Sequence, residues 1–225
     1  MRFLIIPILI SSIISCSTTT QNTTKSNKVE TVEAIPKDLT EIKSIVLNPN
    51  LASADQMKSL AEVDGELANS IISRRPFLKS MEFLEFIKSS LDSAQFLSLK
   101  ENLYVPMNLN TAAESDFMNV PGVGKKMAHE FGEYRPYKSI EQFKREIGKY
   151  VDEKEVNRYL QYVFVPINLN TASKEEILGI PGVGEKMANE FEEYRPYQEI
   201  IQFEREMKKY ISDKEVARLK RFVTL

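Results

Sequence analysis

Two copies of a Pro-Gly-Val-Gly turn are the residues of this sequence best suited to bind a ligand. They occupy positions 121–124 and 181–184. Glycine allows positive φ and leaves no side chain over the backbone, so a phosphate oxygen can approach exposed N–H groups. A helix is predicted to start directly after each turn, and its free N–H groups and positive dipole end favour an anion. The turns are therefore predicted to bind the phosphates of a nucleic acid independently of its sequence. This binding is expected to weaken as the salt concentration rises.

The predicted phosphate-binding residues are these turns and the lysines that follow them. The copies differ at one position, where Glu185 replaces Lys125. A carboxylate at a helix start would satisfy the N–H groups that a phosphate needs, so the turn at 181–184 is expected to be the weaker site. The predicted nucleic-acid-binding residues are Gly122, Val123, Gly124, Lys125, Lys126, Gly182, Val183, Gly184 and Lys186.

Each turn lies in a 60-residue block, and the sequence contains three such blocks. They span 46–105, 106–165 and 166–225, and an internal repeat of this kind is the strongest architectural signal in the chain. The first block has Ala-Glu-Val-Asp where the others have Pro-Gly-Val-Gly, so Glu62 and Asp64 would repel phosphate there. Because the rest of the pattern survives this change, the fold does not require the glycines. This comparison favours a function for the other two turns.

Four short helices are predicted in each block, so the fold class is predicted to be all-α. In the second block, Thr111 and Glu114 fit a capping box at the start of the first helix. Tyr134 and Tyr194 close an i, i+4, i+7 apolar pattern and are therefore expected to point into the core. No segment alternates as a sheet strand does, and the block junctions are predicted to be extended connectors.

The residues "INLNTASKEEILGIPGVGEKMANEFEEYRPY", at 167–197, resemble the first hairpin of the ComEA-type helix-hairpin-helix domain, known from the competence DNA receptor. The resemblance covers the second and third blocks well and the first weakly. It implies three tandem helix-hairpin-helix domains, sequence-independent DNA binding by the turns, and a role in DNA uptake. In relatives a second Gly-x-Gly hairpin partners the first across the DNA. The corresponding junctions here, "GKYVDEKE", "KKYISDKE" and "KSSLDSAQ", lack the glycine pair.

The charge balance leaves a second interpretation open. The formal net charge is only -2 and the sequence pI is about 5.7, so no global basic field attracts nucleic acid. Similar helix-hairpin-helix folds also serve as protein-packing modules, as in an extrinsic protein of photosystem II and in minor pseudopilins. The alternative function is therefore a lipid-anchored protein-protein interaction or scaffold module with partners in the cell envelope and no DNA.

The N-terminus predicts export and a lipid anchor. A basic residue and an apolar run precede the only cysteine, Cys16, which predicts a lipoprotein signal peptide over 1–15. The residues "IISC" resemble a lipobox, which implies that Cys16 is lipidated and attaches the protein to a membrane of the bacterial cell envelope, outside the cytoplasm. An ordinary signal peptide followed by a chance cysteine is the alternative. Together with Cys16, the polar stretch over 16–45 is predicted to be a flexible tether.

No catalytic activity, cofactor or metal is expected. His129 is the only histidine, and the equivalent positions in the other blocks are Asn69 and Asn189, so it is interpreted as a surface residue. The residues Gly-Val-Gly-Lys-Lys lack the spacing of a Walker A loop, and no strand is predicted before them. With one histidine and one cysteine, the chain offers neither a metal cluster nor a nucleophile constellation.

Overall fold

Residues 45–225 are described by the computed structural model, and the signal peptide, Cys16 and all of the predicted tether except its last residue lie outside them. The described part forms α-helices joined by short loops and a few two-residue strands, which confirms the predicted all-α class. No described helix is both long enough and apolar enough to cross a membrane.

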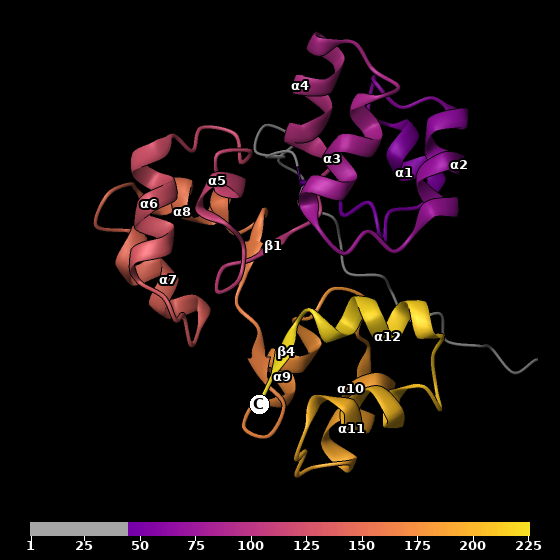
Figure 1. The fold of residues 1–225 in the computed structure, drawn as a ribbon, viewed down its shortest axis with the longest axis vertical. Helices are drawn as coiled ribbons and strands as arrows, with labels where there is room; N and C mark the ends of the chain where they lie inside the picture. Colours follow the sequence, from indigo (N-terminus) through magenta and orange to yellow (C-terminus); the bar gives the residue numbers. More distant parts are fainter. Residues whose placement is uncertain (1–44) are drawn as a thin grey trace, which may run out of the picture. The chain divides into compact units, whose positions relative to one another are not determined.

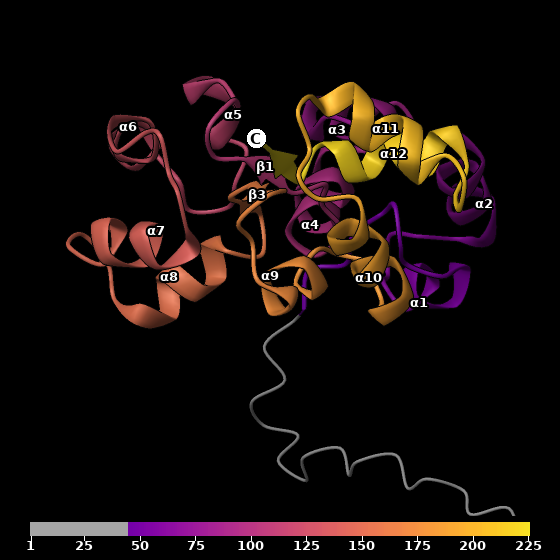
Figure 2. The same ribbon diagram turned by 90° about the horizontal axis from the view of Figure 1, so that it is seen from below.

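The helices fall into three groups of four, one in each predicted block (Figure 1). The first group consists of α1 (Ala54–Lys58), α2 (Gly65–Arg74), α3 (Ser80–Lys88) and α4 (Ser93–Asn102). The second consists of α5 (Glu114–Phe117), α6 (Lys125–Glu133), α7 (Ile140–Ile147) and α8 (Glu153–Tyr159). The third consists of α9 (Lys174–Leu178), α10 (Glu185–Glu193), α11 (Ile200–Met207) and α12 (Asp213–Lys220). Figure 2 shows α5 to α8 together again from a second direction.

Parallel backbone pairing joins the beginning and the end of each group. Strand β1 (Met107–Asn108) pairs with β2 (Val163–Phe164), and β3 (Ile167–Asn168) pairs with β4 (Val223–Thr224). A single bridge between Leu47 and Leu103 takes the same place in the first group. The junctions predicted to be extended connectors are thus extended and also paired. Two residues are too few to produce the alternation that identifies a strand in a sequence.

The start of the second group differs from the prediction. Helix α5 begins at Glu114 with Ala113 in the capping position, so the capping box expected from Thr111 and Glu114 is wrong. Ser53 and Ser173 take the position of Ala113 in the other groups, and each caps its helix through a complete capping box. Alanine has no side-chain acceptor, which is why this helix start lacks a side-chain cap.

An asparagine near the start of each group binds the backbone just before the third helix. The amide Nδ2 of Asn50 donates to the carbonyl of Phe77 at 2.9 Å, and the N–H of Phe77 donates back to Oδ1 at 2.8 Å. The same two bonds recur in the other groups, between Asn110 and Tyr137 and between Asn170 and Tyr197. The second asparagine of Asn-Leu-Asn is therefore a part of the fold.

The arginine of each Arg-Pro pair ties the same two segments together. Arg195 donates from Nε to the carbonyl of Leu169 at 2.6 Å and from Nη2 to the carbonyl of Ala172 at 2.7 Å. Arg75 and Arg135 likewise donate to the carbonyls of Ala52 and Ala112. Since all three groups keep the bond to the alanine carbonyl, the Arg-Pro-aromatic motif is also structural.

Aromatic rings fill the core of each group of helices. In the second group Phe131 is fully buried, and its ring makes edge-on contacts at 5.2–5.3 Å with the rings of Phe117, Phe143 and Tyr159. The buried side chains of the first two groups form one continuous cluster, and those of the third form another. The third group therefore has a core of its own.

The substitution Asn50→Ala is expected to lower the free energy of unfolding by about 2–4 kcal/mol. It leaves the N–H and the C=O of Phe77 without partners, and an unsatisfied buried group costs about 1–3 kcal/mol. Urea unfolding followed by circular dichroism measures the change. Asn69→Ala, at an exposed position of α2, is the matched control and should stay within about 0.5 kcal/mol of the wild type. Equal unfolding midpoints for the two variants would contradict the structural role of Asn50.

Candidate nucleic-acid interface

The two glycines of each Pro-Gly-Val-Gly turn adopt different backbone conformations. Gly122 has φ of 75° and Gly182 has φ of 82°, both in the left-handed region that favours glycine. Gly124 and Gly184 have φ of -90° and -104° with ψ near 180°, an extended conformation open to any residue. Positive φ, suggested for both glycines of a turn, therefore occurs only at the first.

An arginine from the last helix of the second group lies against the first glycine. Arg158 of α8 donates from Nη2 to the carbonyl of Pro121 at 2.6 Å and forms an ion pair with Glu155. A Cβ atom added to Gly122 would lie 2.9 Å from that same Nη2 atom. The first glycine is therefore explained by the fold, through both its φ and the space that the guanidinium occupies.

The third group repeats this arrangement and the first lacks it. Arg218 donates from Nη1 to the carbonyl of Pro181 at 2.7 Å, and its side chain is 2% exposed. The first group has Ser98 at the position of both arginines. Sequence analysis missed the two arginines, although one signal was present: the arginine occurs only in the blocks that carry Pro-Gly.

The second glycine of each turn lies at the start of a helix, where the protein itself does not require glycine. No side chain caps α6 after Gly124 or α10 after Gly184, and a Cβ atom at either glycine would have no atom within 4 Å. In the first group Asp64 takes this place with φ of -86° and ψ of -179°, and its carboxylate accepts the N–H of Leu67 at 2.8 Å. Aspartate thus fills the helix N-terminus that the glycines leave open.

The valines between the glycines belong to the core. Val123 and Val183 are buried, and their N–H groups donate to the carbonyls of Val120 and Ile180, each at 3.0 Å. They hold the shape of the turn. Any amides that bind a ligand are therefore those of the glycines and of the first turn of each helix, which has no intrahelical acceptor for its N–H groups.

Lysines project from the start of both helices. Lys125, Lys126 and Lys186 are exposed, and none of them forms an ion pair within residues 45–225. Glu185 does not cap α10 as expected, because its Oε2 atom lies 2.8 Å from Nζ of Lys174. The amides of α10 are therefore open as well.

One contact distinguishes the turn of the third group, at 181–184, from the turn of the second group, at 121–124. A Cβ atom added to Gly182 would lie 3.0 Å from Cδ2 of Leu51, a residue of the first group. At Gly122 the three atoms nearest to the corresponding point all belong to Glu155 and Arg158 of the same group. The first glycine of the turn at 181–184 therefore lies near the first group as well as near Arg218.

Pairs of tyrosines lie at the surface of the second and third groups. The hydroxyl oxygens of Tyr134 and Tyr150 are 2.7 Å apart, and those of Tyr194 and Tyr210 are 2.8 Å apart. Tyr134 and Tyr194 were expected to point into the core, but they are only half-buried. Their rings pack against the core while their hydroxyls reach the surface, which is a common arrangement for this amphipathic side chain.

In the third group, the partner tyrosine and the helix start line one surface hollow. The hollow has a volume of about 570 Å³ and is lined by Gly184 and Lys186 together with Lys209 and Tyr210 from the loop between α11 and α12. Glu185 and Glu190 line it as well. The loop that was set aside for lacking a glycine pair therefore contributes to the same surface as the turn.

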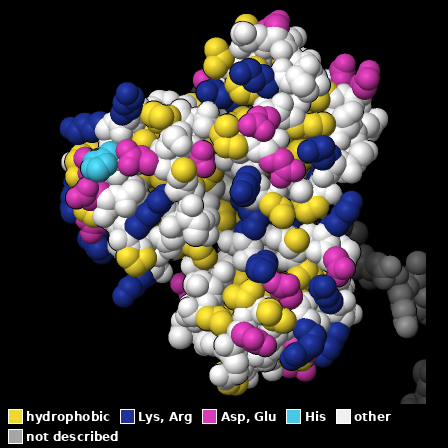
Figure 3. All heavy atoms as spheres, viewed as in Figure 1, with side chains coloured by type: hydrophobic (Ala, Val, Ile, Leu, Met, Phe, Trp, Pro, Cys, Tyr) yellow, Lys and Arg dark blue, Asp and Glu magenta, His cyan; other side chains and the backbone are white. Residues whose placement is uncertain are grey.

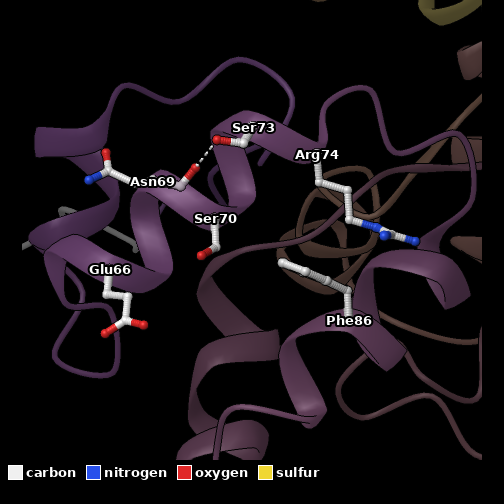
Figure 4. Close-up of a pocket in the computed structure, with 6 residues that line it drawn as sticks. All are labelled: Glu66, Asn69, Ser70, Ser73, Arg74 and Phe86. Carbon is white, nitrogen blue, oxygen red and sulfur yellow. Dashed lines mark hydrogen bonds between the residues drawn. The ribbon is translucent and has the colours of Figure 1, made fainter.

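The first group has a hollow lined by α2 and Phe86 (Figure 4). Arg74 takes the position of Tyr134, and its guanidinium lies over the ring of Phe86 at 5.4 Å from the ring centre. Ser90 takes the position of Tyr150. The first group therefore has neither open helix amides nor a tyrosine pair.

Charge is mixed over the face shown in Figure 3, where lysine and arginine side chains are interspersed with aspartate and glutamate. His129 is exposed, with Nε2 3.0 Å from Glu133 and Nδ1 3.6 Å from Glu114. Within the described residues no group of three or more His, Cys, Asp or Glu side chains is placed to hold a metal ion. On that face no large region of one charge sign attracts an anion.

A family model described as the helix-hairpin-helix motif matches residues 102–154 and 163–224, together a little more than half of the chain. This chain belongs to the helix-hairpin-helix family. Each matched stretch contains one Pro-Gly-Val-Gly turn, and the motif is generally associated with non-specific DNA binding. The chain matches no curated protein and no solved structure.

The two glycines of a helix-hairpin-helix turn are expected to differ in their effect on stability. Gly122→Ala should lower the free energy of unfolding by about 1–2 kcal/mol, since L-residues disfavour positive φ by that amount and the new methyl group also meets Arg158. Gly124→Ala should change it by less than about 0.5 kcal/mol, because its backbone is extended and its surroundings are open. Urea unfolding of both variants measures the difference, and a larger loss for Gly124→Ala would show that the fold needs that glycine.

Proposed function

We propose that this helix-hairpin-helix protein binds the phosphate backbone of DNA without sequence preference, through the N-termini of α6 and α10. The observation that carries the proposal is the pair Gly124 and Gly184 at positions where Asp64 caps its helix in the first group. A glycine at this position cannot cap the helix with a side chain, and neither the backbone conformation nor the surrounding space requires glycine there. An anionic ligand that uses the same amides accounts for it.

Each site offers a phosphate three kinds of attraction. The glycine lets a phosphate oxygen come close to the backbone, the first-turn N–H groups donate to it, and the helix dipole adds a positive potential. Lys125 and Lys126 add two charges at the second group, whereas Lys186 adds one at the third beside Glu185. The site at α6 is therefore proposed to be the stronger.

The N-terminal sequence supports a proposal about where this activity takes place. We propose that the protein acts by binding rather than by catalysis, and that a lipid at Cys16 anchors it in the bacterial cell envelope. A protein that holds DNA at a membrane would suit DNA uptake. A protein-packing role without DNA is the competing function, and the experiment below distinguishes the two.

Gly124→Asp and Gly184→Asp reproduce in the second and third groups the cap that Asp64 already forms in the first. The double variant is expected to bind a labelled duplex at least about tenfold more weakly at low salt, because the carboxylates occupy the amides and repel phosphate. Its stability should be unchanged or higher by a few tenths of a kcal/mol, since aspartate is the better cap. Fluorescence anisotropy with the full-length protein in detergent, across a salt series, measures the binding.

Asn69→Asp is the control for added negative charge, because it lies on the exposed surface of α2 in the first group. It should bind nearly as the wild type does. If the double variant also bound as the wild type does, the amides would not be the site. No binding by the wild type at low salt would favour the protein-packing role.

A further inference from the structure

Two exposed tyrosines distinguish the second and third groups from the first. Tyr150 is 39% exposed and Tyr210 is 41% exposed, and each lies in the loop between the third and fourth helices of its group. The first group has a serine, Ser90, at the position that corresponds to both tyrosines. An aromatic ring this exposed has an apolar surface that is available to a partner.

The structure holds both rings in place. The hydroxyl of Tyr150 meets that of Tyr134, whose ring packs on the core, and Tyr210 meets Tyr194 in the same way. Hydrogen bonds to the partner tyrosine and to the carboxylate of Glu130 raise the pKa of Tyr150, so its phenol stays neutral. A fixed, neutral ring loses little conformational entropy when another ring stacks on it.

A lysine accompanies each tyrosine pair. Nζ of Lys149 lies 5.0 Å from the ring centre of Tyr134, and Nζ of Lys209 lies 4.8 Å from that of Tyr194. Each lysine also pairs with a glutamate three residues before it, Glu146 or Glu206. Cationic side chains beside aromatic rings are typical of surfaces that follow a single nucleic-acid strand.

The ring and the candidate phosphate site are close enough to serve one ligand. Tyr210 and Gly184 line the same hollow of about 570 Å³. A nucleotide joins a phosphate to a flat aromatic base through a sugar, so its phosphate would lie at the amides of α10 while its base lies against the tyrosine. Glu190 also lines the hollow, and with Tyr194 its carboxylate raises the pKa of Tyr210, which stays neutral.

We propose that Tyr150 and Tyr210 stack on unpaired bases, so that the protein prefers single-stranded DNA to duplex. Bases in a duplex are stacked on each other, and their faces are not open to a side chain, whereas bases of a single strand splay out and stack on aromatic residues. Every base has such a face, so the preference is for strandedness and not for sequence. The inference rests on the proposed phosphate binding, which supplies the neighbouring contact.

The test compares three labelled ligands of equal length with the full-length protein in detergent: a single strand, an abasic single strand and a duplex. Single-stranded DNA is expected to bind about tenfold more tightly than the abasic strand, since one stacked base contributes a factor of this order or more. The abasic strand keeps its phosphates and should still bind. This comparison uses the unaltered protein, so it does not depend on how any variant folds.

Variants then assign the effect to the tyrosines. The double variant with Tyr150→Leu and Tyr210→Leu should bind the single strand about tenfold more weakly and the abasic strand and duplex unchanged. The matched variant with Tyr150→Phe and Tyr210→Phe keeps both rings and should retain the preference. The chain contains no tryptophan but nine tyrosines, so the part of the tyrosine quenching by the single strand that is lost in the leucine variant reports stacking on Tyr150 and Tyr210.

Two results would overturn the inference, and they can be distinguished from failure of the proposed function. Equal binding of the normal and abasic strands, or an unchanged preference in the leucine variant, would refute stacking while leaving phosphate binding intact. If none of the three ligands bound at low salt, both proposals would fail together.

Discussion

Every group of helices depends on the bonds by which an asparagine side chain holds the backbone 27 residues later. Helices of four to ten residues are too short to be stable alone, and a 60-residue unit buries only a small core. The bonds of Asn110 to Tyr137, and of Arg135 to the same opening segment, therefore fix where the third helix begins. With the segments held, the fourth helix lies where Arg158 reaches the turn at Pro121. The geometry of the candidate site is thus a consequence of polar contacts distant from it.

The degenerate first group separates what the fold needs from what a ligand would need. It keeps Asn50 and Arg75 with their bonds, so these residues serve the fold in all three groups. It has lost the first glycine together with the arginine that contacts it, which shows that these two form one structural unit. At the position of the second glycine it has Asp64, in nearly the same backbone conformation. The fold therefore explains the first glycine of each turn but not the second. The sequence alone could not separate the two glycines, because the first block has lost both of them.

Much of the fold could be predicted from local patterns. The caps at Ser139, Asp152 and Ser212 are of this kind, because a capping bond joins residues three apart. The residues that were missed or misplaced act over longer distances. The carbonyl of Pro121 and the guanidinium of Arg158 lie 37 residues apart in the chain, and such a contact leaves no periodic trace. The same holds for the remaining differences, which are the pairing of Glu185 with Lys174, the hydroxyl contact of Tyr134 with Tyr150 and the contact of Leu51 at Gly182.

A net charge of only -2 and a mixed surface determine how such a protein would hold DNA. Few lysines face each proposed site, so few counterions are released and the binding of one site is weak. Two sites on one chain change this result, because a strand held at α6 is present near α10 at a high effective concentration. Binding then strengthens with the length of the strand and not with its sequence. Weak, repeated contacts that use amides and aromatic rings suit the retention of a long polymer, because a single contact can release while the others hold.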